Sequence, residues 1–346
     1  MPVADAARAP DIPAVFSIRA GDQSVYLART SVLGRRLRRV LKLWNLAQVA
    51  TEIEYWPTHS RLEAALYHYF AARRLYGDDY TRRIKLRSPA YVKLLLGNRF
   101  PRLQVTSRLT GGRALYYGPF RTRAAAETFE TACLDLFQLR RCQEDLVPSP
   151  DHPGCVYGEM NLCLRPCQQV CSEEEYASEA ARVADFLHSD GAALLRSARS
   201  ARDRLSEEMN FEEAARQHRR VENIEATLAL RGELARELSL LHGVAILPGE
   251  GEAVKLWYLV DGWWQTPREV RFLEAGLPVD TQLKQATTSL VPVQGTLVER
   301  QEHLAILAGW RFSSWTDGEW LPFDDFTSVP YRRFANAVAR VRKGVV

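Results

Sequence analysis

Four cysteines lie within a window of 26 residues near the middle of the chain, in the order C-x12-C-x7-C-x3-C: Cys142, Cys155, Cys163 and Cys167. They fall in or beside a stretch, residues 147–164, that is rich in turn-forming residues and poor in apolar side chains. Free structural cysteines favour buried, apolar surroundings instead. A segment without a core of its own needs a cross-link to keep its shape, and the sequence predicts one at these four thiols.

The compartment of the protein decides which cross-link is expected. The 346 residues contain no run of 18 apolar residues and no apolar leader after Met1, so we expect a cytoplasmic protein without a membrane partner. Disulfides are disfavoured there, which favours a metal centre and leaves two disulfides as the weaker alternative. Four thiolates hold zinc as readily as an iron–sulfur cluster, so the residues alone leave both open.

Positive charge is concentrated in the first part of the chain. Residues 1–143 contain 24 Lys and Arg against 11 Asp and Glu, whereas the rest of the chain contains 22 against 31. This asymmetry favours a polyanionic partner for the basic part, although a basic face can also be merely solvated. Clustering of the cations favours a phosphate-facing surface, as on a protein that binds nucleic acid. The predicted DNA-binding residues are Arg29, Arg35, Arg36, Arg38, Arg39 and Lys42.

Hydrophobic periodicity predicts an α+β fold. A β-hairpin is expected over residues 13–30, then a basic helix over 32–43, a strand over 50–56, and a helix whose capping box consists of Ser60 and Glu63. Further strands and a helix follow, at 91–96, 103–108 and 121–139.

The second half of the chain has a different texture. Two helices, 173–208 and 211–240, have apolar residues at three- and four-residue spacing and predict an antiparallel helical hairpin. From Gly243 the pattern is again that of strands, and a basic helix is expected near 335–342.

These elements divide into five expected segments. In order they are a disordered N-terminus, a small α/β domain, a cysteine-rich segment stapled by metal, the helical hairpin and a mostly-β C-terminal domain. Their expected bounds are 1–12, 13–88, 89–172, 173–240 and 241–346.

Several short motifs occur in a fixed order: Pro13-Ala14-Val15-Phe16, Val25-Tyr26-Leu27-Ala28, Phe100-Pro101-Arg102-Leu103, Tyr117-Gly118-Pro119-Phe120, Leu139-Arg140-Arg141-Cys142 and Met209-Asn210-Phe211-Glu212-Glu213-Ala214-Ala215. In this order they resemble the N-terminal two-thirds of UvrC, the excinuclease component of bacterial nucleotide excision repair. The resemblance runs from about residue 13 to 275 and rests on the order of the motifs rather than on any one of them.

The resemblance implies that residues 13–88 form a GIY-YIG nuclease domain whose site is degenerate. Tyr26 and Arg36 match the family's second tyrosine and its arginine, whereas Phe16 stands for the first tyrosine and His68 for the metal-binding glutamate. Magnesium prefers carboxylate oxygen to imidazole, so we expect no divalent metal there and an inactive site with these four residues as vestiges. The alternatives for His68 are an ordinary helix residue or a site rewired for manganese or zinc.

The cysteine spacing is close to that of the family's 4Fe–4S ligands. The resemblance therefore implies a 4Fe–4S cluster on Cys142, Cys155, Cys163 and Cys167, with structural zinc as the alternative and no nucleotide cofactor. Its expected role is structural, with redox sensing as a further option.

The hairpin resembles the UVR motif, which pairs with a like hairpin on the helicase subunit UvrB. The resemblance implies a UvrB-like partner, and the expected contact residues are Phe211, Ala214, Ala215 and His218. His218-Arg219 replaces the family's Arg-Asp pair, and packing within the chain is the alternative role.

The function implied is that of an accessory or regulatory factor of nucleotide excision repair, within the SOS response, that binds double-stranded DNA and does not incise it. Residues 241–346 resemble the start of the family's C-terminal half and are too few for its complete second nuclease domain. One alternative is an active, metal-dependent, structure- or lesion-specific endonuclease with a remodelled site. The other is an iron–sulfur or zinc protein with a structural or sensing role and no DNA partner, which the basic part of the chain disfavours.

Overall fold

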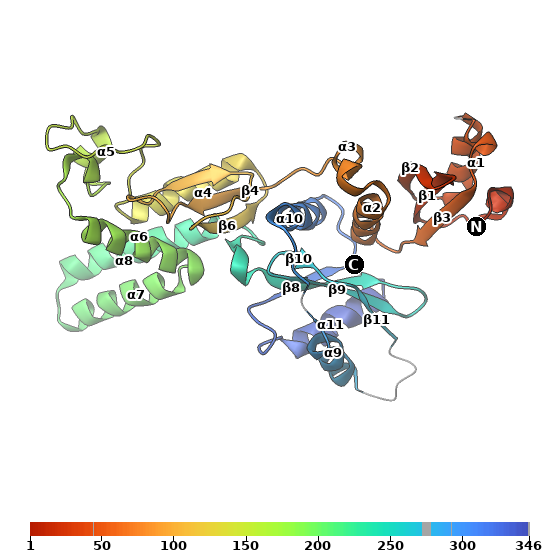
Figure 1. Ribbon diagram of the computed structural model, residues 1–346. Helices are drawn as coiled ribbons and strands as arrows, with labels where there is room; N and C mark the ends of the chain where they lie inside the picture. The colour runs from red at the N-terminus through yellow and green to blue at the C-terminus, as the bar shows by residue number, and fades with distance from the viewer. Residues whose placement is uncertain (44, 272–277, 292, 345–346) are drawn as a thin grey trace. The chain divides into compact units, whose positions relative to one another are not determined.

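The computed structural model describes residues 1–43, 45–271, 278–291 and 293–344, and it mixes helices with antiparallel sheets (Figure 1). The α+β prediction is therefore confirmed. Contacts group the chain into two compact units. Unit one contains residues 1–87, 242–294 and 305–346, and unit two contains 88–241 and 295–304. The five-segment division made from the sequence stays a prediction.

Unit one begins with a three-stranded antiparallel sheet in the order β2-β1-β3. The strands are β1 (Ala14–Ala20), β2 (Gln23–Thr30) and β3 (Glu52–Pro57), and α1 (Leu33–Leu43) and α2 (Arg61–Tyr76) pack on them. The short helices η2 (Leu46–Gln48), η3 (Gly77–Asp79) and α3 (Tyr80–Arg83) complete this part. The hairpin forms as predicted, and Phe16 and Ile18 of β1 enter the core with the apolar face of α1.

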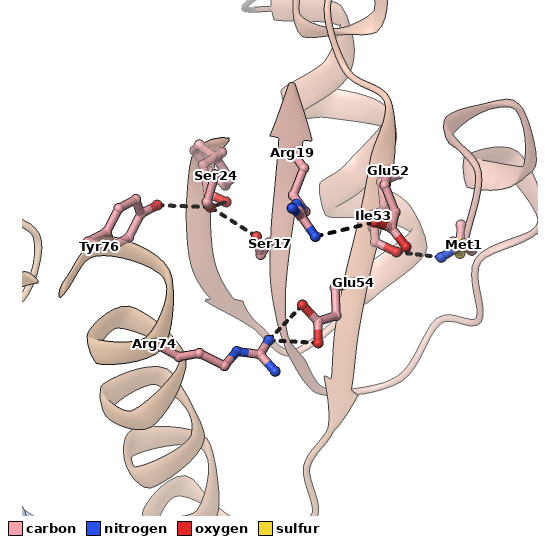
Figure 2. A network of polar contacts seen from close by, with 10 residues as sticks. Met1, Ser17, Arg19, Ser24, Glu52, Ile53, Glu54, Arg74 and Tyr76 are labelled. Carbon is pink, nitrogen blue, oxygen red and sulfur yellow. Dashed lines mark hydrogen bonds and ion pairs between the residues drawn. The ribbon is translucent and has the colours of Figure 1, made fainter. Parts of the chain in front are cut away.

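Polar contacts fix α2 and the chain start on this sheet. One guanidinium nitrogen of Arg74, Nη2, donates to both carboxylate oxygens of Glu54, at 2.7 and 2.6 Å (Figure 2). The Tyr76 hydroxyl lies 3.2 Å from the Ser24 hydroxyl. Both contacts tie the last turns of α2 to strands β2 and β3.

The first residues, expected to be disordered, instead lie against β3. Val3–Arg8 form a short 3-10 helix, η1, and Pro2 bridges Glu52. The Met1 ammonium donates to the Ile53 carbonyl at 2.6 Å (Figure 2). The Ala6 side chain of η1 joins the core beside α1, which supplies apolar burial that the Ala- and Pro-rich composition did not suggest.

The C-terminal part of unit one is a second antiparallel sheet in the order β10-β9-β8-β12, with β11 also on β9. Helices α9 and α11 pack in one core with β8 and β9, while Trp257 of β9 stacks on Phe70 of α2 at 6.4 Å. The bounds are β8 (His242–Pro248), β9 (Val254–Val260), β10 (Trp263–Trp264), β11 (Arg268–Val270), α9 (Val279–Thr288), β12 (Glu319–Phe323) and α11 (Tyr331–Arg342). Helix α10 (Leu297–Arg311) is divided between the units, with residues up to 304 in unit two and the rest in unit one.

Unit two contains a four-stranded antiparallel sheet in the order β5-β4-β6-β7, with α4 packed on it. The bounds are β4 (Ala90–Leu94), β5 (Leu103–Thr106), β6 (Leu115–Phe120), α4 (Arg123–Leu136), β7 (Arg236–Glu237) and η5 (Leu238–Leu240). Phe129 of α4 stacks on Tyr117 of β6 at 5.1 Å within this core.

Helices complete unit two. The cysteine-rich segment contains α5 (Val156–Glu159) and η4 (Pro166–Gln168), and α6 (Glu173–His188), α7 (Ala192–Glu207) and α8 (Phe211–Ala229) follow it. Helices α7 and α8 run side by side as a hairpin, as predicted (Figure 1). The helix expected over 211–240 ends at Ala229, however, and β7 and η5 follow it. No helix in the described part of the chain is long and apolar enough to cross a membrane.

Candidate nucleic-acid interface and cysteine centre

Helix α1 presents an exposed cationic face. Leu33, Leu37 and Val40 are buried against the sheet, which turns the intervening residues toward solvent. Within the described ranges, no acidic side chain pairs with Arg35, Arg38, Arg39 or Lys42. Unpaired cations on one helix face attract a polyanion more strongly than neutralised ones.

The two retained site residues are in direct contact. Arg36 is half-buried on α1 and donates a hydrogen bond to the Tyr26 hydroxyl of β2 at 3.0 Å. The Phe16 ring lies 5.6 Å from that of Tyr26 and is completely buried. The arginine and both rings predicted from the sequence therefore come together, and Phe16 has no hydroxyl to add to the arrangement.

His68 lies half-buried on α2. Burial lowers its pKa to about 4, and the positive charge of Arg29 on β2 acts in the same direction. The imidazole is therefore neutral at physiological pH. A neutral imidazole beside an arginine offers one nitrogen ligand and none of the negative charge that a hard cation prefers.

Glu63 is the carboxylate of α2, and its contacts in the fold leave it unavailable as a metal ligand. Its side chain has no exposed surface, pairs with Lys255 of β9 and accepts the backbone N–H of His59 at 2.7 Å. The sequence placed Glu63 in a capping box, and the Ser60 hydroxyl does accept the Glu63 N–H at 3.0 Å. The partner on β9, 192 residues away, had no sequence signal.

The four predicted ligands are free thiols in one region of unit two. Cys163 and Cys167 are buried, Cys142 is half-buried and Cys155 is exposed. Burial raises the pKa of Cys163 to about 11. A hydrogen bond from the Arg165 N–H lowers this pKa, and the charges of the other three thiols raise it. Each thiol is thus near enough to disfavour ionisation of Cys163.

Arg140 and Tyr176, which sequence reasoning did not select, hold this segment. The buried Arg140 side chain donates to the carbonyls of Phe100 and Glu144 at 3.1 and 2.7 Å, and to the Cys142 sulfur at 3.6 Å. The Tyr176 hydroxyl accepts the Arg140 N–H at 2.9 Å and donates to the Pro101 carbonyl at 2.8 Å. The motif Leu139-Arg140-Arg141-Cys142 was the sequence signal that could have pointed to Arg140.

The chemistry of the donor set fits a thiolate-bound metal centre. Repulsion among four thiolates is relieved by a cation, and N–H groups that point at Cys142 and Cys163 sulfur are typical of iron–sulfur surroundings. In this conformation no group of three or more His, Cys, Asp or Glu side chains, in the ranges that the structure describes, is arranged to hold a metal ion. Cys133 is a core residue of α4, and Cys171 is half-buried beyond η4.

The turn between α7 and α8 and the first residue of α8 expose two large apolar side chains. Met209 and Phe211 have 77% and 66% of their surface exposed. Ala214 is buried, whereas Ala215 is exposed, and His218 is exposed with Glu222 at 3.5 Å. Phe211, Ala215 and His218 are therefore accessible on the hairpin, and Ala214 packs inside it.

The middle of the chain is similar to a known protein domain. Residues 90–186, which extend from β4 into the last turn of α6 and include all four predicted ligand cysteines, match the family model of the UvrC/Cho excinuclease middle domain. UvrABC system protein C of Lachnospira eligens is 28% identical over 207 residues, covering 56% of this chain and 33% of that protein.

Two further relatives give the same result. UvrABC system protein C of Natronomonas pharaonis is 25% identical, covering 72% of this chain and 44% of that protein. The protein of the same name from Rickettsia bellii is 29% identical, covering 57% and 32%. The chain thus spans between about a third and a half of the length of these relatives, and no solved structure matches it.

Proposed function

The chain belongs to the UvrC family, and we propose that it is a DNA-binding factor of nucleotide excision repair that does not itself incise DNA. The observation that carries the proposal is the combination on one small domain of an unpaired cationic helix with a site that lacks its carboxylate. Arg35, Arg38, Arg39 and Lys42 supply the affinity for phosphates, and His68 stands where a metal-binding carboxylate would be needed.

The proposed mode of binding is electrostatic contact with the DNA backbone. Arginines on a helix face bind phosphate oxygens without reading the sequence, and each contact releases counterions. Arg36 has a different proposed role, because its hydrogen bond to the Tyr26 hydroxyl holds it in the degenerate nuclease site. There it would bind a phosphate, but no nucleophile would be activated.

The proposed absence of incision has a basis in the chemistry of the site. Hydrolysis of a phosphodiester requires an activated water and neutralisation of the charge that develops on phosphorus oxygens. His68 is held neutral by burial and by Arg29, and Glu63 is neutralised by Lys255. In this proposal the domain therefore binds the phosphate without positioning a metal-bound nucleophile.

The cysteine centre is proposed to hold a 4Fe–4S cluster, with zinc as the alternative ligand of the same thiols. Such a cluster would cross-link the segment that Arg140 and Tyr176 already frame. Cys142, Cys155, Cys163 and Cys167 are the proposed ligands, and the contribution of the cluster is the stability of this segment. Anaerobic purification with iron and zinc analysis distinguishes the two metals.

The exposed apolar tip of the α7–α8 hairpin is the proposed contact for a protein partner. The relatives are named as members of the UvrABC system, so a UvrB-like helicase subunit is the candidate partner. Phe211 and His218 are accessible for such a contact, whereas Ala214 supports the hairpin from inside.

A nicking assay tests the proposal. The purified chain is incubated with magnesium or manganese and a lesion-bearing duplex, with binding measured on the same sample. We expect salt-sensitive binding and intact strands. Nicking that disappears in Tyr26→Phe would establish the alternative, an active endonuclease with a remodelled site, and absence of any DNA binding would favour a metal protein with a structural or sensing role.

A further inference from the structure

A pocket of about 470 Å³ opens in unit one between the end of β2 and the start of α2. Its lining includes Arg29, Thr30 and Ser31 from the end of β2 and the turn that follows it, and His59 and Arg61 from the start of α2. No acidic side chain in the described part of the chain pairs with the guanidinium of Arg29 or Arg61. Two unpaired guanidinium groups with neighbouring hydroxyls are the donor set that an oxyanion requires.

One carboxylate enters this pocket from a distant part of the sequence. Asp317, from the turn before β12, also lines the pocket and accepts the backbone N–H of Arg61 at 2.5 Å through Oδ2. Its other carboxylate oxygen accepts the Trp310 indole N–H at 3.3 Å. The first N–H groups of a helix attract anions, and here an internal anion occupies that position.

From this arrangement we infer that the pocket binds a phosphate group of nucleic acid and that Asp317 competes with it. Arg29 and Arg61 would bind the phosphate oxygens while the Ser31 hydroxyl donates a hydrogen bond to them. The Thr30 hydroxyl already donates to the Val32 carbonyl at 3.2 Å, so it lines the pocket without acting as a donor to the ligand. Asp317 would then either leave the Arg61 N–H or remain as a like charge beside the ligand. The carboxylate therefore makes binding weaker and more selective than the arginines alone would.

Two further observations agree with a positive site. The charge of Arg29 helps to depress the pKa of His68 on α2, so its field reaches the helix. The buried Glu63 near the start of α2 is neutralised by Lys255 and does not cancel the arginines. In addition, Trp315, two residues before Asp317, has 73% of its surface exposed and offers a ring on which a base can stack.

The inference rests on the proposed DNA-binding function but is tested separately from it. Inorganic phosphate and deoxythymidine 5′-monophosphate are titrated into the full chain by calorimetry. We expect both to bind, and Arg29→Ala or Arg61→Ala to weaken the affinity by about tenfold or more, as removal of a charge-assisted hydrogen bond predicts. Arg113→Ala, an exposed arginine of unit two, is the matched control and should change nothing.

The competing carboxylate provides a gain-of-affinity test. Asp317→Asn preserves side-chain size and removes the charge, so phosphate affinity should rise by roughly threefold to tenfold. Thermal melting confirms that each variant is folded. Absence of phosphate binding by the wild-type chain, or a folded Asp317→Asn variant with unchanged affinity, would overturn the inference.

DNA duplexes then identify the source of the phosphate. An intact duplex, a nicked duplex with a 5′-phosphate and one with a 5′-hydroxyl are compared, each with the wild type and Arg61→Ala. A preference for the 5′-phosphate that Arg61→Ala removes assigns a strand end, and an equal decrease on all three assigns the continuous backbone. Phosphate binding without duplex binding would contradict the proposed function alone, and duplex binding indifferent to Arg29 and Arg61 would contradict the pocket alone.

Discussion

Glu63 of α2 and Lys255 of β9 form an ion pair in which the carboxylate has no exposed surface and the ammonium side chain is 14% exposed. The pair joins the α2 helix of the N-terminal sheet to the C-terminal sheet within unit one. Burial raises the pKa of Tyr67 to about 12, and the negative charge of Glu63 acts in the same direction. The only acidic residue of α2 is therefore structural in this fold.

Breaking this pair should destabilise unit one. Lys255→Met leaves Glu63 buried without its counter-charge, and we expect a decrease of about 3 to 5 kcal/mol in the free energy of unfolding. The double variant Glu63→Leu with Lys255→Met should recover most of that decrease. Urea denaturation measures both, and Glu127→Ala, which breaks an exposed pair with Arg123, is the control with little effect. Equal decreases in the single and double variants would contradict the assignment.

His68 should make unit one less stable in acid. Its pKa is about 4 in the folded state against an ordinary value of 6.5, so below pH 6.5 the unfolded chain binds a proton that the folded chain does not. Stability contributed by the neutral imidazole is complete above pH 6.5 and falls as the pH drops toward 4, by at most about 3 kcal/mol. Chemical denaturation at a series of pH values measures the change.

His68→Gln is the matched variant for this effect. The glutamine side chain is neutral at every pH, so the slope of stability against pH between 6.5 and 4 should become shallower. A wild-type slope preserved in His68→Gln would assign the acid sensitivity to other groups.

Local pattern predicts elements well where burial is one-sided. The β1–β2 hairpin and α1 differ by no more than a residue or two from expectation, because apolar residues alternate or recur at helical spacing there. The expected helix 173–208 is two helices, α6 and α7, since the chain turns at Asp190 and Gly191, both with positive φ. For α9, α10 and β6 the pattern assigns no element.

The candidate site was predictable only as far as its contacts are short in sequence or match a known motif. Tyr26 and Arg36, which the family motif singles out, are 10 residues apart and in contact. Asp317 at the start of α2 and Lys255 at Glu63 depend on pairings across 256 and 192 residues, for which a single sequence contains no signal. Arg140 lay within a noted landmark, but its role depends on carbonyls that only the folded backbone brings together.

Arg140→Met should loosen the cysteine-rich segment specifically. The variant keeps apolar bulk but leaves the carbonyls of Phe100 and Glu144 without their donor, at a cost of about 2 kcal/mol or more. Hydrogen exchange should speed up in residues 142–171 and remain slow in β8 and β9 of unit one. Arg123→Ala, an exposed arginine of α4, is the control, and uniform acceleration in both units would contradict a local role.

DNA affinity should fall with the cations of α1. Arg35→Ala with Arg39→Ala removes two exposed charges that no acidic group in the described ranges neutralises. The slope of log affinity against log salt should become shallower by roughly one for each phosphate no longer bound. Fluorescence anisotropy with a labelled duplex at several salt concentrations gives the slope. As a control, Arg199→Ala removes an exposed arginine of α7 that is paired with Glu225, and the salt slope should stay unchanged. An unchanged slope in the double variant would place the DNA elsewhere.

The hairpin tip should matter for a partner and not for folding. Met209→Ser and Phe211→Ser replace side chains that are 77% and 66% exposed, so we expect each to change the free energy of unfolding by less than about 0.5 kcal/mol. Binding to a purified UvrB-like helicase subunit, measured by calorimetry, should weaken about tenfold or more in Phe211→Ser, because an exposed aromatic anchor is removed. Val298→Ser, an exposed apolar residue of α10, is the matched control. Full binding by a folded Phe211→Ser variant would assign the hairpin to packing within the chain alone, since its partner surface would then contribute nothing.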